Sequence, residues 1–188
     1  MDMLINYLLQ FGSLNTQQIE LVKSKFKIIN VPKETYIYEA GNFVNELCFL
    51  KSGITRVCYY NHKGDEITKY FIDEFHFTTD ANSFLYKMPT TAYVQTVLDC
   101  ELYAISRNDF EELSNIIISW DKMFLKIITK GMADKVDRIS PMLAETAKER
   151  YLNFMERYPN LINRIPLSLI ASFLGITTSS LSRIRRSI

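Results

Sequence analysis

Two hydrophobic patterns divide the chain near residue 106. From residue 27 to residue 105, short segments rich in β-branched and aromatic residues follow one another, and turn signals such as Lys63-Gly64-Asp65 separate them. Many short strands at close spacing are typical of an antiparallel sandwich or barrel. The segments predicted as strands are Lys27–Val31, Thr35–Tyr38, Glu46–Lys51, Ile54–Tyr60, Glu66–Ile72, Ala92–Leu98 and Glu101–Ile105.

After Ser106 the apolar residues recur every three or four positions, which is the period of an α-helix. Ser106 is a suitable N-cap, and Asp109 three residues later adds a weak capping-box pattern. One continuous apolar stripe comprises Phe124, Ile128, Met132, Val136, Ile139 and Leu143. Pro141 is expected to end or bend this long helix. Further helices are expected at Thr16–Val22, at Thr146–Arg157 and, as a final pair, within Pro166–Ser187.

The composition excludes several classes of protein. The 188 residues suffice for one or two compact domains with an ample core. Cys48, Cys58 and Cys100 are too few and too scattered for a disulfide framework or a zinc finger. The sequence has no run of about 18 apolar residues, and its N-terminus lacks the positive flank of a signal peptide. We therefore expect a cytoplasmic protein that does not engage a membrane.

Charge is unevenly distributed along the chain. The whole sequence carries 22 Lys and Arg against 21 Asp and Glu, a net charge of +1. Residues 1–143 hold 15 basic and 18 acidic residues, a net charge of −3, whereas residues 144–188 hold 7 and 3, a net charge of +4. Such asymmetry is a hint of a segment that binds a polyanion, although a solvated helix face has the same composition.

The segment 167–186 meets the spacing requirements of a helix-turn-helix. Ala171 is small where the second helix would cross the first, Gly175 tolerates a left-handed backbone in the turn, and Thr177 is a suitable N-cap. The apolar residues that would close the core between the helices are Ile170, Leu174, Ile176, Leu181 and Ile184. An ordinary helical hairpin packed on the protein is the alternative, but here all these requirements are met together beside a basic surplus.

The second helix of this pair would present short polar residues followed by arginines. Arg183 can reach the edge of a guanine, which is worth roughly 1–3 kcal/mol of discrimination between bases. Arg185 and Arg186 are expected to contact phosphates, which adds affinity without sequence information. We therefore expect double-stranded DNA as the partner, and the candidate DNA-binding residues are Thr177, Thr178, Ser179, Ser182, Arg183, Arg185 and Arg186.

The order of these parts resembles the CRP/FNR family of transcription regulators over nearly the whole chain. The segment from Gly41 to Val57 is similar to the family's β-roll signature, with Asn42 where Asp is usual. Residues 142–155 resemble the helix after the family's hinge, and residues 170–184 resemble its DNA-reading unit. The resemblance implies a regulator and not an enzyme.

The resemblance also implies an α+β fold in three parts. These are an antiparallel β-roll sensor domain, double-stranded β-helix or jelly-roll-like, at 1–106, a long connecting and dimerisation helix at 107–143, and a winged helix-turn-helix domain at 144–188. A homodimer would place two recognition helices one DNA turn apart, about 34 Å, on a palindromic site. The candidate dimer residues are Phe124, Ile128, Met132, Val136 and Ile139. The stripe would equally suit packing of the helix against the chain's own β-roll.

The candidate effector pocket departs from the pattern of cyclic-nucleotide binders. Thr79-Asp80 and Thr90-Thr91 stand where the family has a Gly-Glu pair and an Arg-Ser or Arg-Ala pair, and the sequence has no Arg between Arg56 and Arg107. Because that Arg pairs with the cyclic phosphate, we do not expect cAMP or cGMP to bind in the family's manner. The candidate pocket residues, for an unidentified small-molecule effector, are Phe71, Phe77, Thr79, Asp80, Thr90, Thr91, Met132 and Val136.

Other sensors and functions fit less well. Three separated cysteines cannot supply the four ligands of an iron–sulfur cluster, and neither His62 nor His76 is expected to bind haem, so we expect no cofactor and no metal. The sequence ends at Ile188, so the β-hairpin wing is expected to be missing or truncated. Two alternatives stay open: a cupin-like β-barrel that binds a ligand or metal, with Glu74 and Asp80 near the histidines, and a partner-binding module with a degenerate helix-turn-helix.

Overall fold

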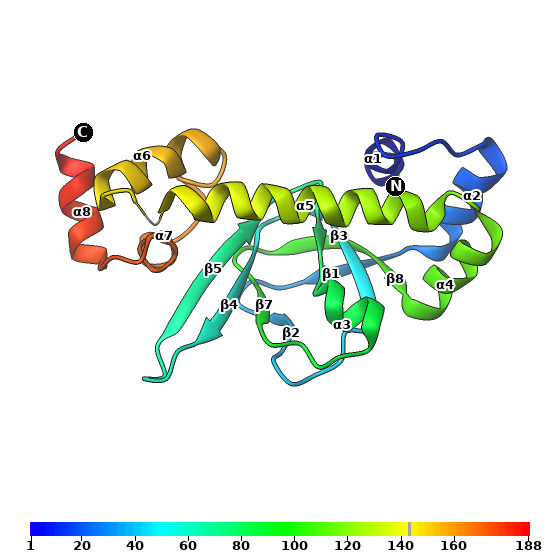
Figure 1. The fold of residues 1–188 in the computed structure, drawn as a ribbon, viewed down its shortest axis with the longest axis horizontal. Coiled ribbons are helices and arrows are strands. Elements are labelled where there is room, and N and C mark those ends of the chain that lie inside the picture. The colour runs from blue at the N-terminus through cyan, green and yellow to red at the C-terminus, as the bar shows by residue number, and fades with distance from the viewer. Residues whose placement is uncertain (143) are drawn as a thin grey trace.

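The computed structural model describes residues 1–142 and 144–188, without the side chains of residues 138–141. Leu143 of the apolar stripe and the side chain of Ile139 therefore lie outside the described residues. Figure 1 shows a long helix, α5, that crosses the molecule lengthwise, with the β-roll and the N-terminal helices along it and the C-terminal helices at its far end. The α+β class, the antiparallel β-roll and the C-terminal helical region are confirmed.

Two four-stranded antiparallel sheets form the β-roll within the described part of the chain. The first sheet has the order β1 (Lys27–Val31), β8 (Cys100–Ser106), β3 (Glu46–Ser52) and β6 (Phe77–Thr78). The second has the order β2 (Tyr36–Tyr38), β7 (Tyr93–Thr96), β4 (Thr55–Tyr60) and β5 (Glu66–Ile72). Each predicted strand corresponds to one of these, with boundaries that differ by at most two residues.

Three short elements had no counterpart among the predictions: the helix α1 (Asp2–Leu8), the strand β6 and the helix α3 (Ala81–Tyr86). All three are too short to show a clear hydrophobic period. For α3 the available signal was local: Asp80 is its N-cap, and its Oδ1 accepts hydrogen bonds from the amides of Asn82 (3.0 Å) and Ser83 (3.2 Å).

The N-terminal helices α1 (Asp2–Leu8) and α2 (Thr16–Lys25) cover one end of the roll. Asn15 caps α2 through a complete capping box with Gln18. The core of this region joins the N-terminal helices, the first sheet and the helices that follow β8. Its buried members include Leu4, Leu8, Val22, Phe49, Tyr103, Leu113, Trp120 and Phe124.

Residues 107–142 form two helices, where the sequence pattern predicted one. The first, α4 (Arg107–Ile116), begins at the Ser106 N-cap, whose Oγ accepts from the amide of Asp109 at 3.1 Å. Ile117 then adopts an extended backbone and buries its side chain in the core, which ends α4. The long helix α5 (Trp120–Met142) begins three residues later and ends one residue after Pro141.

The C-terminal helices form a compact head at the end of α5. They are α6 (Ala147–Arg157), α7 (Leu167–Leu174) and α8 (Thr178–Arg186). Thr146 caps α6 through a second complete capping box, with Glu149. The head has its own buried residues, which include Tyr151, Phe154, Leu161, Ile170, Ala171, Leu174 and Leu181. The described residues after α8, Ser187 and Ile188, form no strand.

Candidate functional site: the α7–α8 head and the β-roll cavity

The angle between α7 and α8 is 100°, within the range of about 90–120° that helix-turn-helix pairs adopt. Gly175 ends α7 with φ of 66°, a left-handed conformation that most residues with a side chain avoid. Thr177 then begins α8, and its Oγ1 accepts from the amide of Ser180 at 3.2 Å. The turn therefore has the backbone conformation and the cap that its sequence predicted.

Packing inside the pair follows the predicted apolar set. Ile170, Ala171, Leu174 and Leu181 are buried, and Ile176 and Ile184 are half-buried against them. Arg150 of α6 reaches across the turn and donates from Nη1 to the carbonyl of Leu174 at 2.5 Å. In the sequence, Arg150 stands out only as part of a family pattern, because its partner is a carbonyl that the fold brings close.

The candidate DNA-binding residues lie on the outer surface of α8 and its cap. Thr177, Thr178, Ser179, Arg183, Arg185 and Arg186 are exposed, and Ser182 is half-buried. Within the described part of the chain, no hydrogen bond or ion pair engages the side chains of Arg183, Arg185 and Arg186. Three unpaired cations near the C-terminus of α8 also suit the helix dipole, so charge alone does not define their role.

A cavity of about 450 Å³ lies between the β-roll and α5. Its walls come from β5, from the region of α3, from residues 90–94 and from the inner face of α5. Seven of the eight candidate pocket residues line it: Phe71, Phe77, Thr79, Asp80, Thr90, Thr91 and Met132. Val136 is not among the lining residues, and its side chain is 60% exposed.

The polar end of this cavity is already hydrogen-bonded within the chain. Asp80 uses Oδ1 to cap α3, and its Oδ2 accepts from the hydroxyl of Thr90 at 2.6 Å. The carboxylate thus occupies the amides of Asn82 and Ser83. A phosphate would meet a negative charge at this position instead of an arginine.

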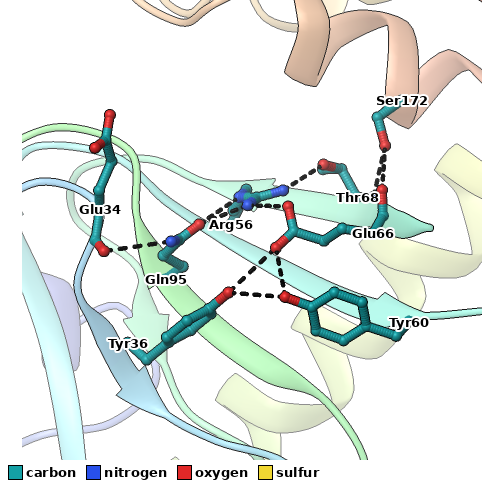
Figure 2. A network of polar contacts seen from close by, with 8 residues as sticks. All are labelled: Glu34, Tyr36, Arg56, Tyr60, Glu66, Thr68, Gln95 and Ser172. Atoms are coloured by element: carbon teal, nitrogen blue, oxygen red, sulfur yellow. Dashed lines mark hydrogen bonds and ion pairs between the residues drawn. The ribbon is translucent and has the colours of Figure 1, made fainter. Parts of the chain in front are cut away.

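Neither flanking arginine is free to reach a ligand. Arg56 of β4 is only 4% exposed, and its guanidinium pairs with Glu66 and donates to Gln95 (2.9 Å from Nε) and Thr68 (3.1 Å), as Figure 2 shows. Arg107 donates to the carbonyls of Phe84 and Val44, the latter at 2.7 Å, and so ties α3 to the roll. The lining residues in the described chain include no arginine.

The cations that do line the cavity were not predicted as a group. Lys69 is exposed on β5, and Lys135 of α5 donates to the hydroxyl of Tyr70 at 3.0 Å with its Nζ 4.3 Å from the ring centre. His76 lies beside Asp73, and that hydrogen bond raises the pKa of the imidazole although burial opposes the charged form. Lysines on a strand and a helix far apart in sequence give no joint signal.

The outer face of α5 carries exposed apolar side chains. Leu125, Met132 and Val136 are 64%, 61% and 60% exposed. Met132 also lines the cavity, and Ile128 is half-buried there. Phe124, which was expected on this face, is instead 5% exposed and packs in the chain's own core, with its ring centre 4.6 Å from that of Phe110. The stripe predicted the helix correctly, but it runs from buried Phe124 to exposed Met132 and Val136.

Other chemistry is not assembled in the described residues. They contain no group of three or more His, Cys, Asp and Glu side chains that could hold a metal ion. Burial raises the pKa of the thiols of Cys48, Cys58 and Cys100 to about 11, which leaves them unreactive at neutral pH. No single described helix is long and apolar enough to cross a membrane, and α7 with α8 reaches that length only across its bend.

Comparison with known proteins shows what the chain is similar to. Residues 28–116 match the family model of the cyclic nucleotide-binding domain, so the β-roll is similar to that class of domain. Solved structures extend the likeness to most of the chain, which is CRP/FNR-like in fold, as the sequence resemblance implied. No curated protein sequence matches the chain significantly.

Three of these solved structures illustrate the likeness. A putative CRP/FNR-family regulator from Eubacterium rectale has a TM-score of 0.75 at 19% identity, covering 97% of this chain and 87% of its own. FixK2 from Bradyrhizobium japonicum has a TM-score of 0.73 at 15% identity, covering 86% and 83%. The c-di-GMP-responsive regulator CLP from Xanthomonas campestris has a TM-score of 0.72 at 15% identity, covering 92% and 91%.

Proposed function

We propose that the protein is a homodimeric, sequence-specific DNA-binding transcription regulator and not an enzyme. The observation that carries this proposal is the α7–α8 pair: two helices at 100° with a left-handed glycine turn, and an outer surface that ends in three unpaired arginines. A helix placed in the major groove needs short polar residues toward its N-terminal end and cations for the phosphates. Thr178, Ser179 and Arg183 are the residues we assign to base contacts.

The distribution of charge supports the same assignment. The head carries a net charge of +4, whereas the remainder of the chain carries −3. A localised basic surface attracts DNA without coating the entire protein in positive charge. Such a regulator would work in the cytoplasm, where the DNA is.

The second copy in the dimer would cover the outer face of α5. Leu125 and Met132 are seven residues apart, and Val136 follows four residues later, which is the spacing of a two-helix seam. Exposure of three large apolar side chains on one helix face disfavours a free monomer. A two-fold axis along α5 would present two copies of α8 to a palindromic site.

The cavity would bind an effector that differs from a cyclic nucleotide held by an arginine. Its apolar walls include Phe71, Phe77 and Met132. Its lysines, Lys69 and Lys135, lie on β5 and α5 and not in the α3 region. Asp80 and Thr90 already bond to each other at the end where the family binds the cyclic phosphate. A small molecule with a substantial apolar body is the class that fits these walls.

Selection of bound sequences from a random DNA pool tests the proposal. We expect enrichment of a palindrome whose half-sites lie one helical turn apart, and an affinity that falls steeply as salt rises. A variant with alanine at Arg183, Arg185 and Arg186 should lose the enrichment, whereas the matched loop variant Lys63→Ala should keep it. Absence of both enrichment and salt-sensitive binding would reject DNA reading and leave a partner-binding module.

A further inference from the structure

Strand β5 is at the edge of its sheet, and helix α7 of the head covers that edge. The order β2-β7-β4-β5 leaves the outer side of β5 without a strand partner. There the hydroxyl of Ser172 accepts from the amide of Thr68 at 2.9 Å and donates to the carbonyl of Glu66 at 3.4 Å. Figure 2 shows Ser172 above these two residues. One side chain of α7 thus satisfies backbone groups that an edge strand otherwise leaves open.

Hydrogen bonds from other strands of the same sheet hold the part of β5 that contacts Ser172. Arg56 is buried and binds the side chains of both Glu66 and Thr68, the two residues whose backbone meets Ser172. The hydroxyls of Tyr36 and Tyr60 each donate to Glu66 Oε2 at 3.2 Å. A hydrogen-bonded network of this kind around a buried arginine fixes the geometry of the strand edge before the head docks on it.

Two further contacts join the head to the β-roll around Ser172. Arg164 pairs with Glu74 through two bonds of 2.5 and 3.1 Å, and Glu74 also accepts from the amide of Gly53 at 3.1 Å. Burial of Glu74 opposes its charge, but these hydrogen bonds outweigh it and lower its pKa. Phe173 packs on Phe71 of β5 with ring centres 5.6 Å apart. The head and the β-roll are therefore joined by a seam of polar contacts at Ser172 and Arg164 and an aromatic contact at Phe173.

None of the residues that we assign to DNA takes part in this seam. Thr178, Ser179 and Arg183 stay exposed while α7 is docked. The docked head thus keeps its reading surface free, which a blocking contact would not do. The same strand also forms a wall of the cavity, because consecutive residues from Lys69 to Asp73 line it.

We propose that the α7–β5 seam, made by Ser172, Phe173 and Arg164, is a positioning device that sets α8 at a fixed place relative to the β-roll. A dimer that reads a palindrome needs two reading helices at one spacing, and a loosely tethered head would lose conformational entropy on binding. The seam removes that cost in advance. Since β5 also lines the cavity, the seam gives the cavity a direct mechanical connection to the head. The DNA part of this inference rests on the proposed function, but the position of the head does not.

The position of the head can be measured without DNA. Spin labels on Lys63→Cys at the β4–β5 turn and Ser187→Cys after α8, diluted with unlabelled protein, report distances within one chain. The three native thiols are buried, so the added ones should label selectively. We expect one narrow distance in this background and a broad distribution when Ser172→Ala and Arg164→Gln are combined. Ser168→Ala, on the exposed side of α7, is the matched control and should stay narrow.

DNA affinity then tests whether the seam positions α8 for binding. The combined Ser172→Ala and Arg164→Gln variant, folded by circular dichroism, should bind its selected site about fivefold more weakly or worse, a coupling at the low end for linked sites. A distance as narrow in this variant as in the background would overturn the seam. A broad distance with unchanged affinity would overturn its positioning role. If the unaltered protein binds no DNA, the proposed function fails, and the distance measurement still judges the seam.

The connection to the cavity has its own test. A side chain at Gly131 would project into open space at the cavity wall, because a Cβ there meets no heavy atom within 4 Å. Gly131→Leu therefore substitutes for a bound ligand, and we expect it to shift or broaden the same distance. An unchanged distance would overturn the connection between cavity and head.

Discussion

Several charged side chains of the β-roll are hydrogen-bonded within the chain, whereas, in the part of the chain that the structure describes, the arginines of α8 have no such partner. In the roll and at its junction with α4, Arg56, Asp80 and Arg107 are hydrogen-bonded within the chain. On α8, Arg183, Arg185 and Arg186 are exposed and unpaired within the described residues. Charged groups that are satisfied internally stabilise structure, whereas charged groups left free on a convex surface are available to a partner. Arginine thus has a structural role in one region and, under the proposed function, a binding role in the other.

Among these predictions, removal of the Arg56 side chain should have the largest effect, on the free energy of unfolding. Arg56→Ala leaves Glu66 without its cation and Thr68 and Gln95 without a donor, so we expect a loss of about 3 kcal/mol in the free energy of unfolding. Urea denaturation followed by circular dichroism measures it. Lys69→Ala on the adjacent strand is the control and should cost little, because Lys69 is exposed. A loss below about 1 kcal/mol would mean that the network is not structural.

The arginines of α8 should affect DNA affinity and leave stability unchanged. Arg183→Ala should reduce the preference for the selected site over a scrambled site by roughly 1–3 kcal/mol. Arg185→Ala or Arg186→Ala should weaken both sites alike and reduce the salt slope by about 1. Titrations at several salt concentrations separate these outcomes. Equal effects of the three changes on both sites would remove Arg183 from base recognition.

A small increase in stability is expected from a substitution in the middle of α5. Gly131 has an ordinary helical backbone and space around its Cα, so Gly131→Ala should raise the free energy of unfolding by about 0.5–1 kcal/mol. Thermal denaturation detects a shift of that size. Gly53→Ala is the contrasting variant and should destabilise, because Gly53 has φ of 104° and a Cβ would approach the carbonyl of Asp99 at 2.6 Å. Destabilisation by Gly131→Ala would show that the glycine is needed for close contact with another helix.

The smallest effect concerns pH and the Glu74–Arg164 pair. The pKa of Glu74 is lowered in the folded protein, so its contribution is present above the ordinary carboxyl pKa and is lost as pH falls through the lowered value. Stability measured from pH 6 to pH 3 should therefore fall more in the unaltered protein than in Arg164→Gln. The difference isolates this pair from other carboxylates such as Asp109, whose pKa is also lowered. Parallel curves would show that the pair adds nothing to stability.

The sequence by itself determined the features that depend on neighbouring residues. Strand positions, the caps Ser106, Thr146 and Thr177, and the turn at Gly175 all follow from hydrogen bonds and backbone preferences within a few residues. The basic head and the missing phosphate-binding arginine are also visible in sequence alone. The candidate pocket residues came from the family resemblance, and seven of the eight line the cavity.

Only the tertiary structure decided which faces these elements present. The period of α5 cannot distinguish Phe124, which is buried against Phe110, from Leu125, which is exposed, because adjacent positions of a helix differ by about 100° and the contacts come from distant segments. The bonds of Asp80 with Thr90, of Arg164 with Glu74 and of Ser172 with the β5 edge likewise join residues 10, 90 and 104 positions apart. Packing of separate segments creates such contacts, and no local pattern encodes them.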